Sequence, residues 1–112
     1  MTLTEMRYIV ALARERHFGK AADACHVSQP TLSVALKKVE GQIGAPLFER
    51  GTNDVRITPL GERLVEQARR VLAEAVKLEE IAEATQMPLG TVKSHVRRGL
   101  VAVRRVLFGE EP

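Results

Sequence analysis

The sequence has 112 residues, of which 45% are hydrophobic and 4% aromatic, and its formal net charge is +3. This length allows one ordinary domain or two very small ones, and an aliphatic core with so few rings predicts packed helices. The single cysteine, Cys25, excludes an internal disulfide and fits a reducing cytoplasm, where we expect the chain. We find no signal peptide and no apolar run of the roughly 18 residues that a membrane span needs.

Two helices are predicted before residue 26. Apolar residues recur at helical spacing over residues 3–14, with Thr2 or Thr4 available as the N-cap. An alanine-rich second helix is expected over residues 18–25, and Cys25 is predicted to be a small buried residue on its packing face.

A third helix is predicted after the interruption "HVS". Ser28 can cap this helix, and Pro30 lies in its first turn, where the missing N–H costs nothing. The helix is expected to run to about Gln42 and to stop at Gly44.

A β-hairpin and a long helix are predicted next. "PLFER" and "VRIT" alternate in the manner of short strands, and "GTND" between them supplies turn residues. Thr58 followed by Pro59 is a strong helix start, and nothing interrupts the helix until about Thr85.

The long helix carries an apolar seam of about three heptads. Because so small a body cannot cover this helix on every side, we expect the seam to meet the same helix of a second chain. A last helix that folds back on the seam within one chain is the alternative. The predicted dimer interface consists of Leu64, Ala68, Val71, Ala75 and Leu78.

One sequence pattern occurs twice. "AADACHVSQPTLSVALKKVE" (21–40) aligns without a gap with "IAEATQMPLGTVKSHVRRGL" (81–100). Each copy has alanines on a first helix, a three-residue turn, and a second helix that begins with small polar residues and continues with cations. This pattern is typical of a helix-turn-helix, whose short polar groups reach base edges and whose cations reach phosphates. Any compact helical hairpin shares the alanine and leucine positions.

Residues 1 to about 80 resemble the DNA-binding domain and linker helix of LysR-type transcriptional regulators, and most of all the peroxide-responsive OxyR branch. The resemblance rests on "YIVALARERHFGKAADACHVSQPTLSVALKKVE" and "LFERGTNDVRITPLGERLVEQARRVL". It implies a winged helix-turn-helix that binds double-stranded DNA as a homodimer, with residues 18–37 as the helix-turn-helix. The implied and expected DNA-binding residues are Ser28, Gln29, Pro30, Thr31, Ser33, Lys37, Arg50 and Arg56.

Two departures from this family pattern are evident. Val34 and Ala35 stand where many relatives carry arginine and a polar residue, which leaves a base or phosphate contact there open. The sensing domain that normally follows the linker helix is missing from the sequence. We therefore expect no inducer pocket, no redox switch, no small-molecule ligand and no cofactor.

Residues from about 78 onward resemble the last helix-turn-helix of extracytoplasmic-function sigma factors. The resemblance rests on "LEEIAEATQMPLGTVKSHVRRGLVAVRRVL", in which His95 stands where arginine is usual. It indicates a chimera and adds RNA polymerase as a candidate partner. The possible second set of DNA contacts consists of Thr91, Lys93, Ser94, His95, Arg97 and Arg98. A solvated basic face without DNA contact is the alternative.

The predicted class is a mostly α fold: a winged helix-turn-helix with a small hairpin (1–58), a linker and dimerisation helix (59–85), and a sigma-like segment (78–108) that overlaps the linker. The three histidines His17, His26 and His95 share no ligand spacing, and we find no nucleophile–base pair, so we expect neither a metal site nor an enzyme. The predicted function is sequence-specific DNA binding as a dimeric regulator module. The alternative is an interaction module without an operator of its own.

Overall fold

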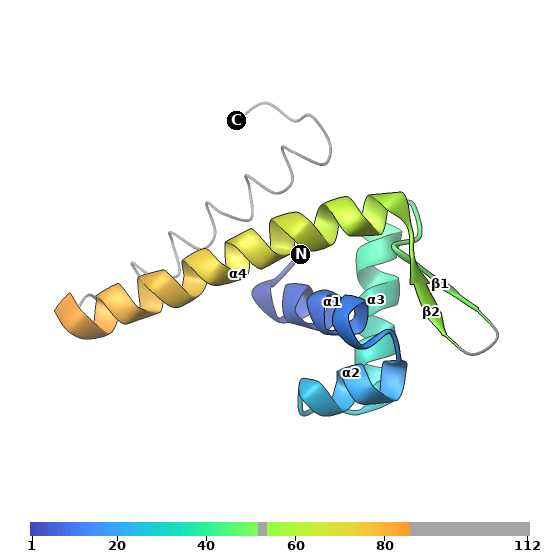
Figure 1. The fold of residues 1–112 in the computed structure, drawn as a ribbon, viewed down its shortest axis with the longest axis horizontal. Helices are drawn as coiled ribbons and strands as arrows, with labels where there is room; N and C mark the ends of the chain where they lie inside the picture. Colours follow the sequence, from blue (N-terminus) through green and yellow to red (C-terminus); the bar gives the residue numbers. More distant parts are fainter. Residues whose placement is uncertain (52–53, 86–112) are drawn as a thin grey trace.

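The computed structural model describes residues 1–51 and 54–85, and every structural statement below refers to this part of the chain. The fold is mostly helical with one two-stranded antiparallel hairpin, as predicted (Figure 1). None of these helices is apolar enough over a sufficient length to cross a membrane. The elements are α1 (Leu3–Glu15), α2 (Phe18–Ala24), α3 (Gln29–Ile43), β1 (Phe48–Arg50), β2 (Val55–Ile57) and α4 (Pro59–Thr85).

Local capping interactions define both ends of α1. The hydroxyl of Thr2 accepts a hydrogen bond from the Glu5 N–H at 3.1 Å, and the Glu5 carboxylate accepts one from the Thr2 N–H at 2.8 Å. This reciprocal pair satisfies two N–H groups that have no partner within the helix. The helix ends at Arg16, whose left-handed backbone (φ 52) breaks the helical path.

The start and end of α3 also match the predicted signals. Ser28 is the N-cap, Pro30 lies within the first turn, and Gly44 ends the helix with φ 83. Glycine suits this left-handed conformation because it has no Cβ to clash with the backbone.

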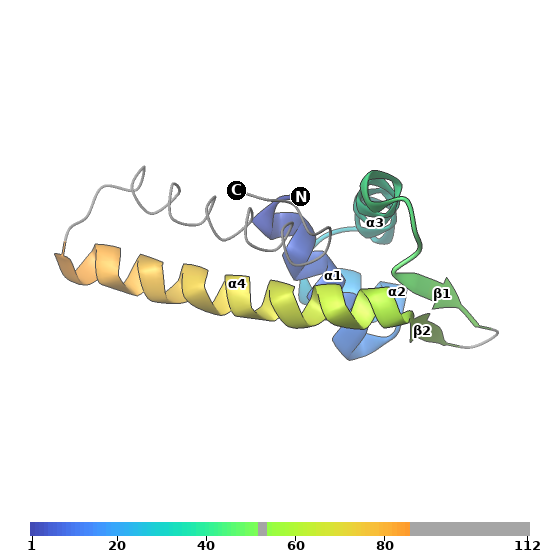
Figure 2. The same ribbon diagram turned by 90° about the horizontal axis from the view of Figure 1, so that it is seen from above.

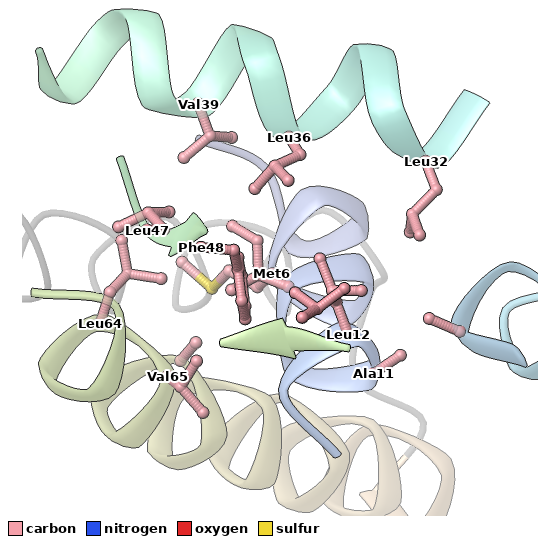
Figure 3. Close-up of a cluster of buried hydrophobic side chains, with 14 of the residues drawn as sticks. Met6, Ala11, Leu12, Leu32, Leu36, Val39, Leu47, Phe48, Leu64 and Val65 are labelled. Atoms are coloured by element: carbon pink, nitrogen blue, oxygen red, sulfur yellow. The ribbon is translucent and has the colours of Figure 1, made fainter. Parts of the chain in front are cut away.

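The hydrophobic core surrounds α1 (Figure 3). Met6, Ile9 and Leu12 of this helix are at most 2% exposed. Each fully buried side chain of this kind stabilises the fold by about 1.5–3 kcal/mol. The partners on α3 and α4 include Leu32, Leu36, Val39, Leu64, Val65 and Ala68.

The first half of α4 packs on α1, and the helix then extends beyond the three-helix body (Figure 2). Leu64 and Ala68 are 0% exposed and Val71 is 9% exposed, all within the core of their own chain. These three positions of the predicted dimer seam therefore have little or no surface that a second chain could cover. Ala75 is also buried and Leu78 is half-buried.

Polar contacts join the end of α3, the hairpin and the start of α4. The Glu40 carboxylate accepts hydrogen bonds from the N–H groups of Leu47 at 2.6 Å and Phe48 at 3.3 Å. The Thr58 hydroxyl donates to the Leu47 carbonyl at 3.1 Å and accepts from the Gly61 N–H at 3.0 Å. A side chain at Gly61 would collide with the Leu47 carbonyl, so glycine permits this close approach.

The second copy of the repeated pattern lies largely outside the described residues. Its first residues, 81–85, form the end of α4. The predicted turn, the last helix and its proposed DNA contacts (Thr91, Lys93, Ser94, His95, Arg97 and Arg98) all fall at residues 86–112.

Candidate nucleic-acid interface

The first copy of the pattern folds as two helices, α2 and α3, that are joined by a short turn. Ala21 and Ala22 of α2 are buried at 0% and 2% exposure, and Val27 in the turn is half-buried against the core. Small side chains at these positions let the helices approach closely. His26 has a left-handed backbone (φ 57), which reverses the chain between the helices. The geometry is that of a helix-turn-helix.

Ser28 and Thr31 organise the first turn of α3. The Ser28 hydroxyl accepts a hydrogen bond from the Thr31 N–H at 3.3 Å and forms a second one with the Thr31 hydroxyl at 2.8 Å. Ser28 therefore has a structural role as the N-cap, in addition to any contact with DNA. Because a hydroxyl both donates and accepts, Thr31 retains capacity to bind a base or a phosphate.

The remaining predicted contacts on α3 lie on one solvent-facing surface. Gln29, Pro30, Thr31 and Lys37 are exposed, whereas Ser33 is half-buried at the edge of this surface. The opposite side of the helix supplies core residues, so the fold fixes which side chains can meet a partner.

The hairpin forms a wing beside the helix-turn-helix. Its register pairs Glu49 with Arg56 and Arg50 with Val55. The Val55 N–H donates a hydrogen bond to the Arg16 carbonyl at 3.3 Å, which ties β2 to the loop before α2. The wing thus has a defined position relative to the helices.

Arg50 is held by an aromatic ring from α2. Its guanidinium carbon lies 4.3 Å from the centroid of the Phe18 ring, within the range of a cation–π interaction. Sequence reasoning identified Arg50 but not the role of Phe18, because an apolar residue at this position is also expected in the core. No local pattern indicates that its ring also orients a cation from the wing.

Arg56 projects from β2 into solvent. Its side chain is 74% exposed, and its Nε lies 3.9 Å from an Asp54 carboxylate oxygen. An exposed ion pair of this length is weak, so the guanidinium stays available to a phosphate.

A shallow cleft of about 320 Å³ joins the wing to α3. Its lining includes Arg16, His17, Gln29, Arg50 and Asp54. The side-chain amide oxygen Oε1 of Gln29 lies 3.8 Å from where a Cβ on Gly19 would be. Gln29 and Arg50, both predicted DNA-binding residues, therefore line the same recess.

Cys25 differs from its predicted environment. It is half-buried at the C-cap of α2, where it closes the helix, and its thiol donates to the Arg7 carbonyl at 3.9 Å. Burial raises the pKa of the Cys25 thiol, and the charges of Arg14 and Arg7 oppose this effect. The thiol is therefore protonated at neutral pH. The structure shows no group of three or more metal-ligating side chains in the described part of the chain.

Residues 3–62, more than half of the chain, match the family model described as "Bacterial regulatory helix-turn-helix protein, lysR family". The fold and this match define a winged helix-turn-helix DNA-binding domain, and the chain belongs to the LysR family. The hydrogen peroxide-inducible genes activator of Dickeya chrysanthemi is 50% identical over 93 residues, which cover 80% of this chain and 30% of that protein. The chain thus spans about a third of the length of such relatives.

Solved structures agree with this assignment. Full-length OxyR from Pseudomonas aeruginosa is similar at a TM-score of 0.72 and 58% identity, over 75% of this chain and 28% of that one. A complex of the BenM DNA-binding domain with benA site 1 DNA is similar at a TM-score of 0.73 and 32% identity. That match covers 78% of this chain and 98% of the BenM domain.

Proposed function

We propose that the chain binds double-stranded DNA at a specific sequence as part of a transcription regulator. In this proposal α3 enters the major groove, and Arg50 and Arg56 of the wing bind the backbone or enter the minor groove. The observation that supports it most is the shared recess of Gln29 and Arg50, which puts a bidentate amide and a cation on one surface. The solved BenM domain, which resembles this chain in fold and size, is in complex with DNA.

Selection from a random DNA pool tests the proposal. The full chain should enrich one motif, and its affinity for that motif should exceed its affinity for a scrambled duplex by about 10³-fold or more at physiological salt. Equal affinity for both duplexes would favour the alternative, an interaction module without an operator of its own.

We further propose that the chain acts as a homodimer through the part of α4 beyond the core. Since Leu64 and Ala68 are fully buried within one chain, the contact must lie farther along the helix, where Val76 is 51% exposed and Leu78 is half-buried. Val71→Glu would destabilise the domain itself, because Val71 belongs to the core.

Val76→Glu separates assembly from folding. Sedimentation of the wild-type chain should give twice the protomer mass of 12.4 kDa, and Val76→Glu should give the protomer mass with an unchanged circular dichroism spectrum. Val34→Glu is the matched control, because it places the same charge at another exposed valine, outside α4. A wild-type chain that sediments as a monomer at micromolar concentration contradicts the dimer.

We infer no base-reading role for the second copy of the pattern. The interpretation of residues from about 78 onward as a sigma-like segment of a chimera rests on sequence alone, as does RNA polymerase as a partner. Replacing Lys93, Arg97 and Arg98 together by alanine should lower affinity for all duplexes without changing the selected motif. A changed motif would show that this segment also reads bases.

A further inference from the structure

The most exposed large apolar side chain in the described part of the chain is Val34, at 67% exposure. It lies in α3, whose core contacts come from Leu32, Leu36 and Val39. Valine is also a poorer helix former than alanine or lysine. Neither packing nor helix formation therefore explains a valine at this position. A lone exposed apolar residue is common on protein surfaces, so exposure alone does not assign Val34 a function, and its position on α3 matters.

Val34 lies in the middle of the solvent-facing stripe of α3. Pro30, Val34, Lys37 and Gly41 follow one another at intervals of four, three and four residues, which places them on one side of the helix. A Cβ added at Gly41 would meet no atom within 4 Å, which confirms that this side is open. Val34 is therefore flanked by the polar first turn and by a cation.

Charge along this stripe favours an anionic partner. Residues 29–38 of α3 contain no acidic residue. Lys38 is drawn toward α1 by Glu5, with 3.6 Å between its Nζ and the carboxylate. The surroundings of Val34 are consequently neutral toward the first turn and basic toward the next.

The chemistry of the major groove offers one apolar group to such a side chain. Each base edge there presents hydrogen-bond donors or acceptors, and only thymine presents a C5-methyl group. Valine has no polar atom beyond its backbone, and its branched Cβ restricts the side chain to few rotamers. It can bury a methyl group, whereas a polar base edge packed against it would lose its hydrogen bonds to water.

We propose that Val34 is a specificity-determining residue that contacts the C5-methyl group of a thymine in the major groove, an inference that rests on the proposed DNA-binding function. The chain should therefore prefer thymine at one site per half-operator through shape and apolar contact.

Deoxyuridine substitution tests this contact. Each thymine of the selected motif is replaced in turn by deoxyuridine, which removes the methyl group and keeps the base pair. At one position per half-site, we expect the wild-type chain to lose about fourfold in affinity, the equivalent of one buried methyl-sized group. Val34→Ala should lose about as much on the thymine duplex and should show no further loss on the deoxyuridine duplex.

Two controls keep the outcomes distinct. Gln42→Ala, at an exposed residue near the other end of α3, should retain the wild-type response to every deoxyuridine. Thermal unfolding of Val34→Ala should occur at or slightly above the wild-type temperature, because the side chain lies outside the core and alanine is the better helix former. If the affinity loss from Val34→Ala adds to the loss from deoxyuridine at every thymine position, Val34 contacts none of the methyl groups. That result would overturn the role of Val34 and leave the proposed function intact. A wild-type chain that enriches no motif would overturn both, before any variant is measured.

Discussion

Helix α3 and the β1–β2 wing meet at one cleft, yet they carry different chemistry. The exposed first turn of α3 offers the neutral side chains Gln29, Pro30 and Thr31, whereas the wing offers the cations Arg50 and Arg56. Neutral amides and hydroxyls distinguish base edges, and cations bind any phosphate. In the proposed function, the first turn of α3 therefore supplies sequence preference and the wing supplies affinity for any duplex.

This division requires that the two elements keep a fixed relative position. Leu47, Phe48 and Val55 anchor the wing in the hydrophobic core. Polar contacts from Glu40 to the start of β1 and from Arg16 to β2 add to this packing. Substitutions that break this link, or that change one element at a time, separate the contributions of α3 and the wing.

Glu40→Ala should have the largest effect. It removes the acceptor for the Leu47 and Phe48 N–H groups, which are partly buried, and should lower the free energy of unfolding by about 2–3 kcal/mol. Urea denaturation measures the change. Glu40→Gln, which keeps one acceptor oxygen, should lose less. A loss as small as that of Arg70→Ala, at an exposed ion pair, would show that the wing is held by packing alone.

Gln29→Ala should weaken binding to the selected motif by about 1–3 kcal/mol and change binding to random duplexes little. Titration of both duplexes at one salt concentration measures this difference. Gln42→Ala, at an exposed glutamine near the other end of the same helix, is the matched control and should leave both affinities unchanged. Equal losses on both duplexes would assign Gln29 to the backbone and remove the distinction between α3 and the wing.

Arg56→Ala should weaken binding to every duplex alike, because Arg56 is expected to meet a phosphate. The slope of log affinity against log salt should become shallower by about 0.9, which corresponds to one lost phosphate contact. Arg69→Ala, at an exposed arginine of α4, should leave the slope unchanged. A loss confined to the selected motif would instead give the wing a share in reading sequence.

Arg50→Lys should have the smallest effect and should isolate the contact with Phe18. Lysine keeps the charge, so the salt slope should stay constant, but it lacks the planar group that stacks on the ring. An affinity loss of about 0.5–1 kcal/mol on all duplexes is expected. Arg56→Lys serves as the comparison, since Arg56 has no aromatic partner in the described part of the chain. Identical losses for the two variants would mean that the ring does not orient Arg50.

Several candidate interface residues could be proposed from the sequence, because the exposure of a residue on a capped helix depends on near neighbours. Gln29, Thr31 and Lys37 follow from the polar start and cationic continuation of a capped helix, and the structure exposes all three. The role of Phe18 could not be predicted, because its partner, Arg50, is 32 positions away in the chain. The partial exposure of Cys25 was also missed, since helical spacing assigns a face but does not show that the residue ends its helix.

The sequence by itself determined where the elements begin and end. Ser28, Gly44 and the Thr58–Pro59 pair act through hydrogen bonds and backbone angles within a few residues, so their effects can be read locally. Only the tertiary structure decided what covers the apolar face of α4. A heptad spacing establishes that a face is apolar but not which surface packs against it. Here α1 packs on Leu64 and Ala68, because the two helices fold into one core and bury both faces together.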